Sequence, residues 1–255
     1  MPKNADRSVK RAIDSLADAI DGPILFIVKG LEAYRGKWGS ASSAIGPEDE
    51  LKVKEQLDCL RGSYRSVAVC INAFGGSSTS AFNITRLLRS RFARITAYIP
   101  HAAASAGTLL TLCADLIYIS GCGYLTMVDP MLRFGPLLVQ ATQILAAGAA
   151  SGTAWAQAEF SAAQSSMRMI EDQLTEVLRK SGYSKAAQSR IKTKLLLQEG
   201  FHDAPLTRDE LRAAGVRVAP SNQCDSSHEL LELERILRLL VASKLDGFVR
   251  TYQPE

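Results

Sequence analysis

Apolar residues in the first half of the chain follow two alternating patterns: short continuous runs, and runs with helical spacing. The continuous runs have the length of strands and are rich in β-branched residues. They cover residues 24–28, 66–71, 95–99 and 116–119. Between the last three runs, helical spacing marks one crossover (Ala81, Ile84, Leu88 and Phe92), and small residues leading to Ala114 mark the next. This order predicts an α/β fold with a mainly parallel sheet and helical crossovers.

Helical periodicity dominates the rest of the chain. Helices are expected over residues 9–20, 48–60, 155–180, 186–197, 207–214 and 229–241. The Gly- and Ser-rich segment 34–47 is expected to form a flexible loop. We therefore predict one domain over residues 1–220 and a helical C-terminal extension over residues 221–255.

The most apolar stretch, residues 135–155, is interrupted by Gln140, Thr142 and Gln143. A membrane-spanning helix needs about 20 mostly apolar residues, so we predict a buried or oligomer-facing helix and no membrane span. Leu137–Ala150 and Leu230–Val241 are two large apolar helical faces. One domain can hardly bury both, so we expect a homo-oligomer with at least one of them at a subunit interface.

Composition excludes several classes of protein. The 255 residues are 47% hydrophobic and 22% charged, a balance that excludes a disordered chain. A net charge of +4 is too small to indicate a nucleic-acid partner. The five cysteines are odd in number and never spaced as CxxC, so neither a disulfide framework nor a zinc site is expected. With no targeting segment at the start, we expect a cytoplasmic protein without metal or cofactor.

Two glycine-bearing turns follow predicted strands and should open at the same edge of the sheet. Gly75-Gly76 leaves backbone N–H groups accessible to a ligand oxygen. In Ala104–Gly107, Ser105 would lie at the start of a helix, where unpaired N–H groups favour a developing oxyanion. The pair suggests a nucleophile facing an oxyanion hole. The alternative is structural: Ser105 as a helix N-cap and Gly75-Gly76 as a tight turn.

Two separated blocks resemble the serine dehydrogenase proteinase family, which has the Clp-type fold of the Clp/crotonase superfamily and is related to signal-peptide peptidase A. The first block contains Gly75-Gly76, the HAAASAGT stretch over residues 101–108, Ala114-Asp115 and Val128–Pro130. The second, residues 202–218, resembles that family's C-terminal histidine motif. The resemblance implies a Clp/crotonase-type sheet and a serine peptidase that acts on peptides or proteins.

Carried over residue by residue, the resemblance makes Ser105 the nucleophile. It makes the amides of Gly75 or Gly76 and of Ala106 the oxyanion donors. Relatives usually have proline before the glycine pair, where this chain has Phe74, so the stiffness of that loop is in question.

The general base is harder to assign, because relatives use either a lysine or a His-Asp pair. No lysine occurs between Lys54 and Lys180, although the late lysines (Lys180, Lys185, Lys192 and Lys194) could reach the site. His202 lies in the second block and is our preferred base, since imidazole titrates near neutrality. The alternative is a capping or core histidine. The sequence leaves open whether His202 would reach Ser105 in its own protomer or in a neighbour.

The other histidines and the acidic residues have simpler interpretations. His101 is interpreted as a packing or hydrogen-bonded residue, and His228 as solvent-facing. Asp129 is a candidate to orient the base, as triad carboxylates do; the alternative is an Asp-Pro turn. Asp115 is expected to cap a helix or pair with an arginine.

Two other functions remain open. The missing lysine and Phe74 would suit a catalytically inactive oligomeric scaffold of the same fold. A crotonase-like acyl-CoA enzyme would share the glycine-rich helix start, but no convincing adenine-nucleotide loop is present. A phosphate loop at residues 75–79 is excluded because its lysine is absent.

Overall fold

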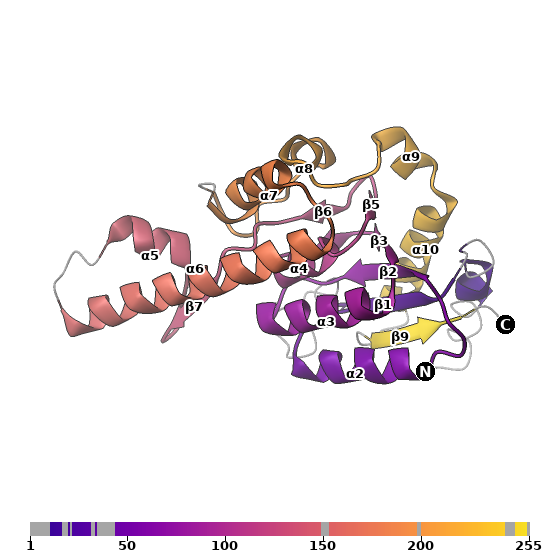
Figure 1. Ribbon diagram of the computed structural model, residues 1–255, viewed down its shortest axis with the longest axis horizontal. Helices are drawn as coiled ribbons and strands as arrows, with labels where there is room; N and C mark the ends of the chain where they lie inside the picture. Colours follow the sequence, from indigo (N-terminus) through magenta and orange to yellow (C-terminus); the bar gives the residue numbers. More distant parts are fainter. Residues whose placement is uncertain are drawn as a thin grey trace.

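A five-stranded sheet forms the centre of the molecule (Figure 1). The computed structural model describes residues 11–16, 20, 22–31, 34, 44–148, 153–197, 200–242 and 248–253. The strand order is β5-β3-β2-β1-β9. The bounds are β1 Ile24–Val28, β2 Ser66–Asn72, β3 Arg94–Ile99, β5 Leu116–Ile119 and β9 Phe248–Tyr252. All neighbours pair in parallel except β9, which runs antiparallel to β1, so the prediction of a mainly parallel α/β fold is confirmed.

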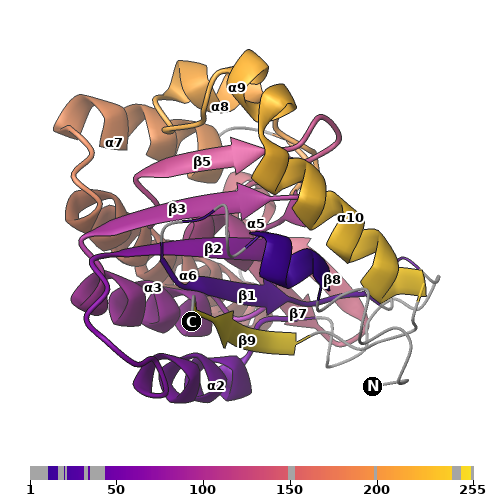
Figure 2. The ribbon, with the colours of Figure 1, turned by 90° about the vertical axis from the view of Figure 1, so that its right-hand side faces the viewer.

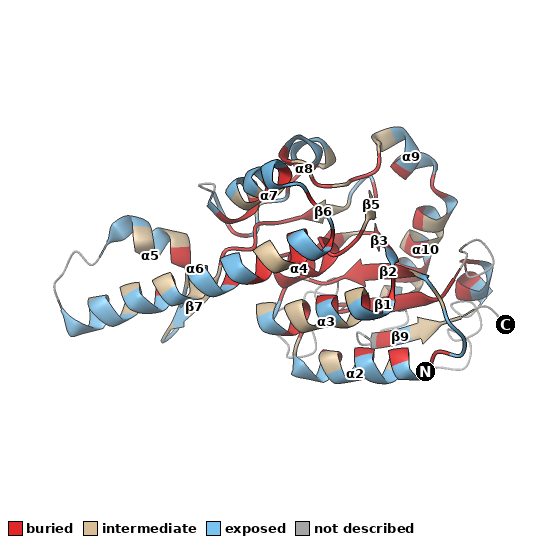
Figure 3. Ribbon diagram, viewed as in Figure 1, coloured by how far each residue is buried: buried red, intermediate tan, exposed pale blue. Residues whose placement is uncertain are grey.

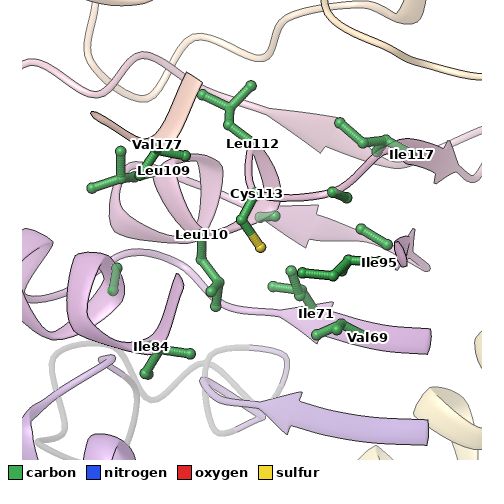
Figure 4. Close-up of a cluster of buried hydrophobic side chains, with 14 of the residues drawn as sticks. Val69, Ile71, Ile84, Ile95, Leu109, Leu110, Leu112, Cys113, Ile117 and Val177 are labelled. Carbon is green, nitrogen blue, oxygen red and sulfur yellow. The ribbon is translucent and has the colours of Figure 1, made fainter. Parts of the chain in front are cut away.

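Both faces of the sheet are covered, as is typical of parallel strands. Alternation along each strand decides the face: Leu25 and Ile27 of β1 belong to one apolar cluster, and Phe26 belongs to the other. Figure 4 shows part of the first cluster, where Leu110 and Cys113 lie beside strand residues such as Ile71. Helix α10 (His228–Ala242) crosses the opposite face (Figure 2). The sheet is therefore the middle of three layers.

The helices largely follow the predicted segments. Their bounds are α2 Pro47–Asp58, α3 Ser78–Arg91, α4 Ala106–Thr111, α5 Ala141–Ala147, α6 Ala154–Lys180, α7 Lys185–Lys192, α8 Arg208–Ala214 and α9 Ser221–Ser226. A π-helical stretch, η3 Thr193–Leu197, continues α7. Of the expected N-terminal helix, residues 11–16 are helical and the remainder lies largely outside the described residues. Most of the predicted loop 34–47 also lies outside them, although Pro47 already belongs to α2.

The apolar stretch 135–155 does not form the single helix that its composition suggested. Strands β7 (Met131–Phe134) and β8 (Leu137–Gln140) form an antiparallel hairpin, and α5 follows. Gly135 provides the turn at φ 59°, a conformation that favours glycine. With the first half of α6, these elements form an arm that extends from the body (Figure 1) and is largely exposed (Figure 3). Leu137 and Leu138 are 63% and 54% exposed on it.

The C-terminal extension is not only helical. Helix α10 buries Leu230, Leu233, Ile236, Leu237 and Leu240 within the protomer, so this apolar face is not available at a subunit interface. Strand β9, which no pattern in the sequence indicated, pairs with β1 and completes the sheet. Among the described residues, none of the helices combines the length and apolarity required to cross a bilayer.

Candidate functional site

Ser105 lies between the two-residue strand β4 (Ala102–Ala103) and helix α4, in a strained backbone conformation. Its φ of 50° and ψ of −112° make it the one non-glycine residue with positive φ in the described part of the chain. Such strain costs on the order of 1–3 kcal/mol and persists only where the surroundings hold it. The serine makes no capping hydrogen bond with its side chain, so the N-cap alternative does not account for it.

Two buried threonines hold this turn in place. The backbone N–H of Ser105 donates to Thr126 Oγ1 at 2.9 Å, and that hydroxyl donates to the carbonyl of Met127 at 3.1 Å. Thr108 Oγ1 donates to the carbonyl of Ala103 at 2.7 Å and accepts from the N–H of Thr126 at 3.1 Å. The sequence analysis missed Thr126, because its role depends on a contact with a residue 21 positions away.

The Gly75-Gly76 turn lies directly against Ser105. A Cβ atom placed on Gly75 would come within 3.3 Å of Ser105 Cβ, and one on Gly76 would come within 2.3 Å of the backbone of Ile45. Ile45 fastens the turn, since its N–H donates to the carbonyl of Gly75 and its carbonyl accepts from Ser77. Both glycines have positive φ, 116° and 134°. Neither their N–H groups nor that of Ala106 donates to an acceptor among the described residues.

His202 and Asp129 lie side by side, although 73 residues separate them in sequence. Leu206 pairs with Leu125 in an antiparallel bridge, and the N–H of Val128 donates to the carbonyl of Leu195. These contacts bring the two segments together, so that His202 Nδ1 lies 2.8 Å from Asp129 Oδ1. Both residues are buried, Asp129 to 1% exposure. The Asp-Pro turn and the local capping histidine are therefore incomplete descriptions of these two residues.

Asp129 has two more partners, which the sequence analysis did not identify. Gln140 Nε2 and Thr142 Oγ1 donate to Asp129 Oδ2 at 2.9 and 3.2 Å. Their only signal in the sequence was that they interrupt an apolar stretch.

One cavity of about 520 Å³ brings the predicted residues together. Its lining includes all six of them: Gly75, Gly76, Ser105, Ala106, Asp129 and His202. Much of the remaining wall is apolar, with Leu109, Met131, Leu138 and Ile170 among the lining residues. Neither Lys nor Arg occurs among the lining residues. His202 thus lines the cavity of Ser105 within a single chain.

The other candidates for the base lie elsewhere. His101 Nδ1 is 2.7 Å from the hydroxyl of Tyr34, and His101 does not line the cavity. Its location agrees with the packing and hydrogen-bonding role expected for it. Burial lowers the pKa of His101. Three of the late lysines form ion pairs outside the cavity: Lys180 with Glu176, Lys192 with Glu171, and Lys194 with Glu210.

The remaining sequence candidates have structural surroundings. Arg89 donates twice to Asp115, at 2.8 and 3.1 Å, which confirms the expected arginine pairing. His228 is exposed at the start of α10, as expected. Within the described residues, no group of His, Cys, Asp and Glu could hold a metal ion.

Comparison with known proteins identifies a family. Residues 56–238 match the model of the family described as ClpP-like SDH-type serine proteinase. Two curated relatives, the uncharacterized proteins MJ1495 and MJ0137 of Methanocaldococcus jannaschii, are each 29% identical, over 170 and 175 residues. Each alignment covers 66% of this chain, but only 56% and 58% of the respective relative. The chain therefore spans less than two thirds of the length of the curated relatives it matches.

Solved structures with some similarity include the following two. The 1510-N membrane-bound stomatin-specific protease is 15% identical with a TM-score of 0.46, covering 71% of this chain and 77% of that one. ClpP1 from Listeria monocytogenes is 15% identical with a TM-score of 0.49, covering 87% of this chain and 99% of that one.

Proposed function

Because the chain belongs to the ClpP-like SDH-type serine proteinase family, we propose that it is a serine peptidase with Ser105 as its nucleophile. A serine hydroxyl is a weak nucleophile until a neighbouring base removes its proton. His202 is that base in our proposal. With Nδ1–H bonded to Asp129, its Nε2 is the nitrogen left to accept a proton.

The reaction proceeds in two displacements. Ser105 Oγ bonds to the carbonyl carbon of the scissile peptide while its proton passes to His202 Nε2. The imidazolium then protonates the leaving amine as the C–N bond breaks, which leaves an acyl-enzyme. A water molecule, deprotonated by the same nitrogen, then bonds to the ester carbon. The bond from that carbon to Ser105 Oγ breaks as the imidazolium returns its proton to Oγ, which releases the acid and regenerates Ser105. The carboxylate of Asp129 stabilises the imidazolium in both halves.

The amides of Gly75, Gly76 and Ala106 are the donors for the tetrahedral oxyanion. Support comes from their lack of acceptors among the described residues and from the contact of Gly75 with Ser105. Donors that are fixed before the reaction lower its barrier without reorganisation, and one such donor typically contributes about 10²–10³ in kcat.

One observation carries the proposal: a serine in a strained turn shares a cavity with a buried His-Asp pair. A structural serine would not need this backbone conformation, and a structural histidine would not need a carboxylate on Nδ1 beside it. The exposed Leu137 and Leu138 of the arm support the further proposal that copies of this chain associate there.

A fluorophosphonate probe tests the proposal directly, because it reacts preferentially with activated serine hydroxyls. We expect covalent labelling of Ser105, located by mass spectrometry of the peptides, and hydrolysis of a fluorescently labelled unfolded protein. Ser105→Ala should abolish both. Ser166→Ala, a matched change of another serine that lines the cavity, should leave both within about twofold.

The other outcomes separate the alternatives. A folded wild type with neither labelling nor hydrolysis would indicate the inactive scaffold. Hydration of the double bond of an enoyl-CoA, or hydrolysis of an acyl-CoA thioester, that persists in Ser105→Ala would indicate the crotonase-like enzyme.

A further inference from the structure

Asp129 is held by two residues of the arm as well as by His202. Gln140 ends β8 and Thr142 lies in the first turn of α5, and both donate to Oδ2, the oxygen that His202 does not contact. The charge of this carboxylate, buried to 1% exposure, is thus shared among three donors. A buried carboxylate is stable only when donors compensate for its lost hydration.

The Gln140 side chain is oriented by its own contacts. Its Nε2 donates to Asp129 Oδ2 at 2.9 Å and to the carbonyl of Gly200 at 3.2 Å. Its Oε1 accepts from Gln143 Nε2 at 3.0 Å. Both amide protons face acceptors and the amide oxygen faces a donor, so a flipped amide would place its one oxygen against both a carboxylate and a carbonyl, and its NH₂ group against the NH₂ group of Gln143. Gln140 is only 3% exposed.

One amide therefore contacts Asp129 directly and the chain next to His202. It binds the carboxylate of Asp129 and the backbone two residues before His202. Thr142 adds a second donor to the same oxygen. We propose that Gln140 and Thr142 are positioning residues that fix the carboxylate so that His202 presents Nε2 toward Ser105. This inference rests on the proposed function of that site.

The charge around His202 makes the role measurable. Of the residues that line the cavity, Asp129 and Asp203 are the charged ones near His202, and no cation lies among them. When a donor on Oδ2 is lost, the imidazolium must compensate for more of the carboxylate's charge. Protonated His202 is then stabilised, and its titration midpoint rises.

The experiment uses isosteric variants that remove one donor each. Gln140→Met lacks the amide, and Thr142→Val lacks the hydroxyl. Thr142→Ser keeps the hydroxyl, and Gln157→Met is the matched control at an exposed position of α6. In Gln140→Met we expect kcat to fall about 10- to 100-fold, because reacting groups are misplaced, with KM within about twofold. Thr142→Val should follow with a smaller loss, and Thr142→Ser should restore activity.

The titration of His202 is the readout that a merely structural role would not move. The chain has three histidines, so NMR of labelled imidazole groups can be assigned with single variants of His101 and His228. In Gln140→Met we expect the midpoint of His202 to rise by about half a pH unit or more, and the acid limb of kcat/KM to move with it. Gln157→Met should match the wild type.

A midpoint that stays at its wild-type value or falls would overturn the positioning role, as would Thr142→Ser behaving like Thr142→Val. NMR needs no turnover. If the protein lacks peptidase activity, the titration still decides whether Gln140 and Thr142 act on the His-Asp pair, so the two proposals fail separately.

Discussion

Two histidines, His101 and His202, are anchored in the same way but in different surroundings. Each holds Nδ1 close to an oxygen, at 2.7 Å for His101 and 2.8 Å for His202. For His202 the oxygen belongs to a buried carboxylate, and the imidazole lines the cavity of Ser105. For His101 it belongs to Tyr34, and the imidazole packs against the rings of Tyr34, Phe74 and Tyr124 outside that cavity. The two histidines therefore differ in the residue that Nδ1 contacts, a phenol for His101 and a carboxylate for His202.

The hydrogen bonds around Tyr34 give Nδ1 of His101 a neutral partner in place of a carboxylate. The Tyr34 hydroxyl donates its single proton to Asn72 Oδ1 at 2.9 Å, so it accepts from Nδ1–H of His101. A phenol offers no negative charge to an imidazolium, and burial lowers the pKa of His101. Burial also raises the pKa of Tyr34, which keeps the phenol neutral. Tyr34 also packs against Phe74, the residue before Gly75, with the ring centroids 5.5 Å apart.

The largest expected effect is the loss of activity on replacing His202, and it tests the comparison between His202 and His101. We expect His202→Gln to lower kcat/KM by about 10³-fold or more, because general-base catalysis contributes about 10²–10⁴. The same change at His101 should cost less than about tenfold, since only a packing contact is lost. Steady-state kinetics on one peptide substrate measures both. Equal losses, or a larger loss in His101→Gln, would mean that the carboxylate partner does not distinguish the two histidines.

A smaller effect is expected at Thr126, whose hydroxyl accepts the hydrogen bond from the backbone N–H of Ser105. Thr126→Val removes the acceptor of the Ser105 N–H and leaves that group without this partner, at a cost of about 1–3 kcal/mol. We expect kcat/KM to fall about tenfold, because the strained turn can relax. Thr126→Ser keeps the hydroxyl and should stay close to the wild type. Kinetics together with urea unfolding would test this, and unchanged values in Thr126→Val would show that the turn needs no such support.

The smallest effect concerns the pH dependence of stability. The folded pKa of His101 is lowered, so the unfolded chain binds more protons as the pH falls through the ordinary histidine value of about 6.5. Stability from this group is therefore complete above that pH and is lost below it. His101→Gln should flatten the dependence between about pH 8 and pH 5.5, and the change should be small because the site is partly exposed. Urea midpoints at both pH values measure it, and identical slopes would contradict the assignment.

Local patterns were enough to predict much of the fold and the part of the candidate site around Ser105. Strand-length apolar runs and helical spacing are short-range signals, and they predicted β1, β2, β3 and β5 within a few residues. The Gly75-Gly76 turn and Ser105 could be identified because glycines and a serine after strands are local features as well. The parallel order of those strands then placed both turns at one edge of the sheet.

What the tertiary structure decided depends on contacts between distant segments. The sequence could name His202 and Asp129, but only the Leu125–Leu206 bridge and the Val128–Leu195 hydrogen bond bring them together. Pairing with β1 made a strand of β9, and the turn at Gly135 made a hairpin where composition suggested a helix. Gln140 and Thr142 interrupt an apolar stretch, yet their donors face a carboxylate more than ten residues away. Periodicity records which face of an element is buried, whereas the partner of a buried polar group is set by packing between elements, which periodicity does not encode.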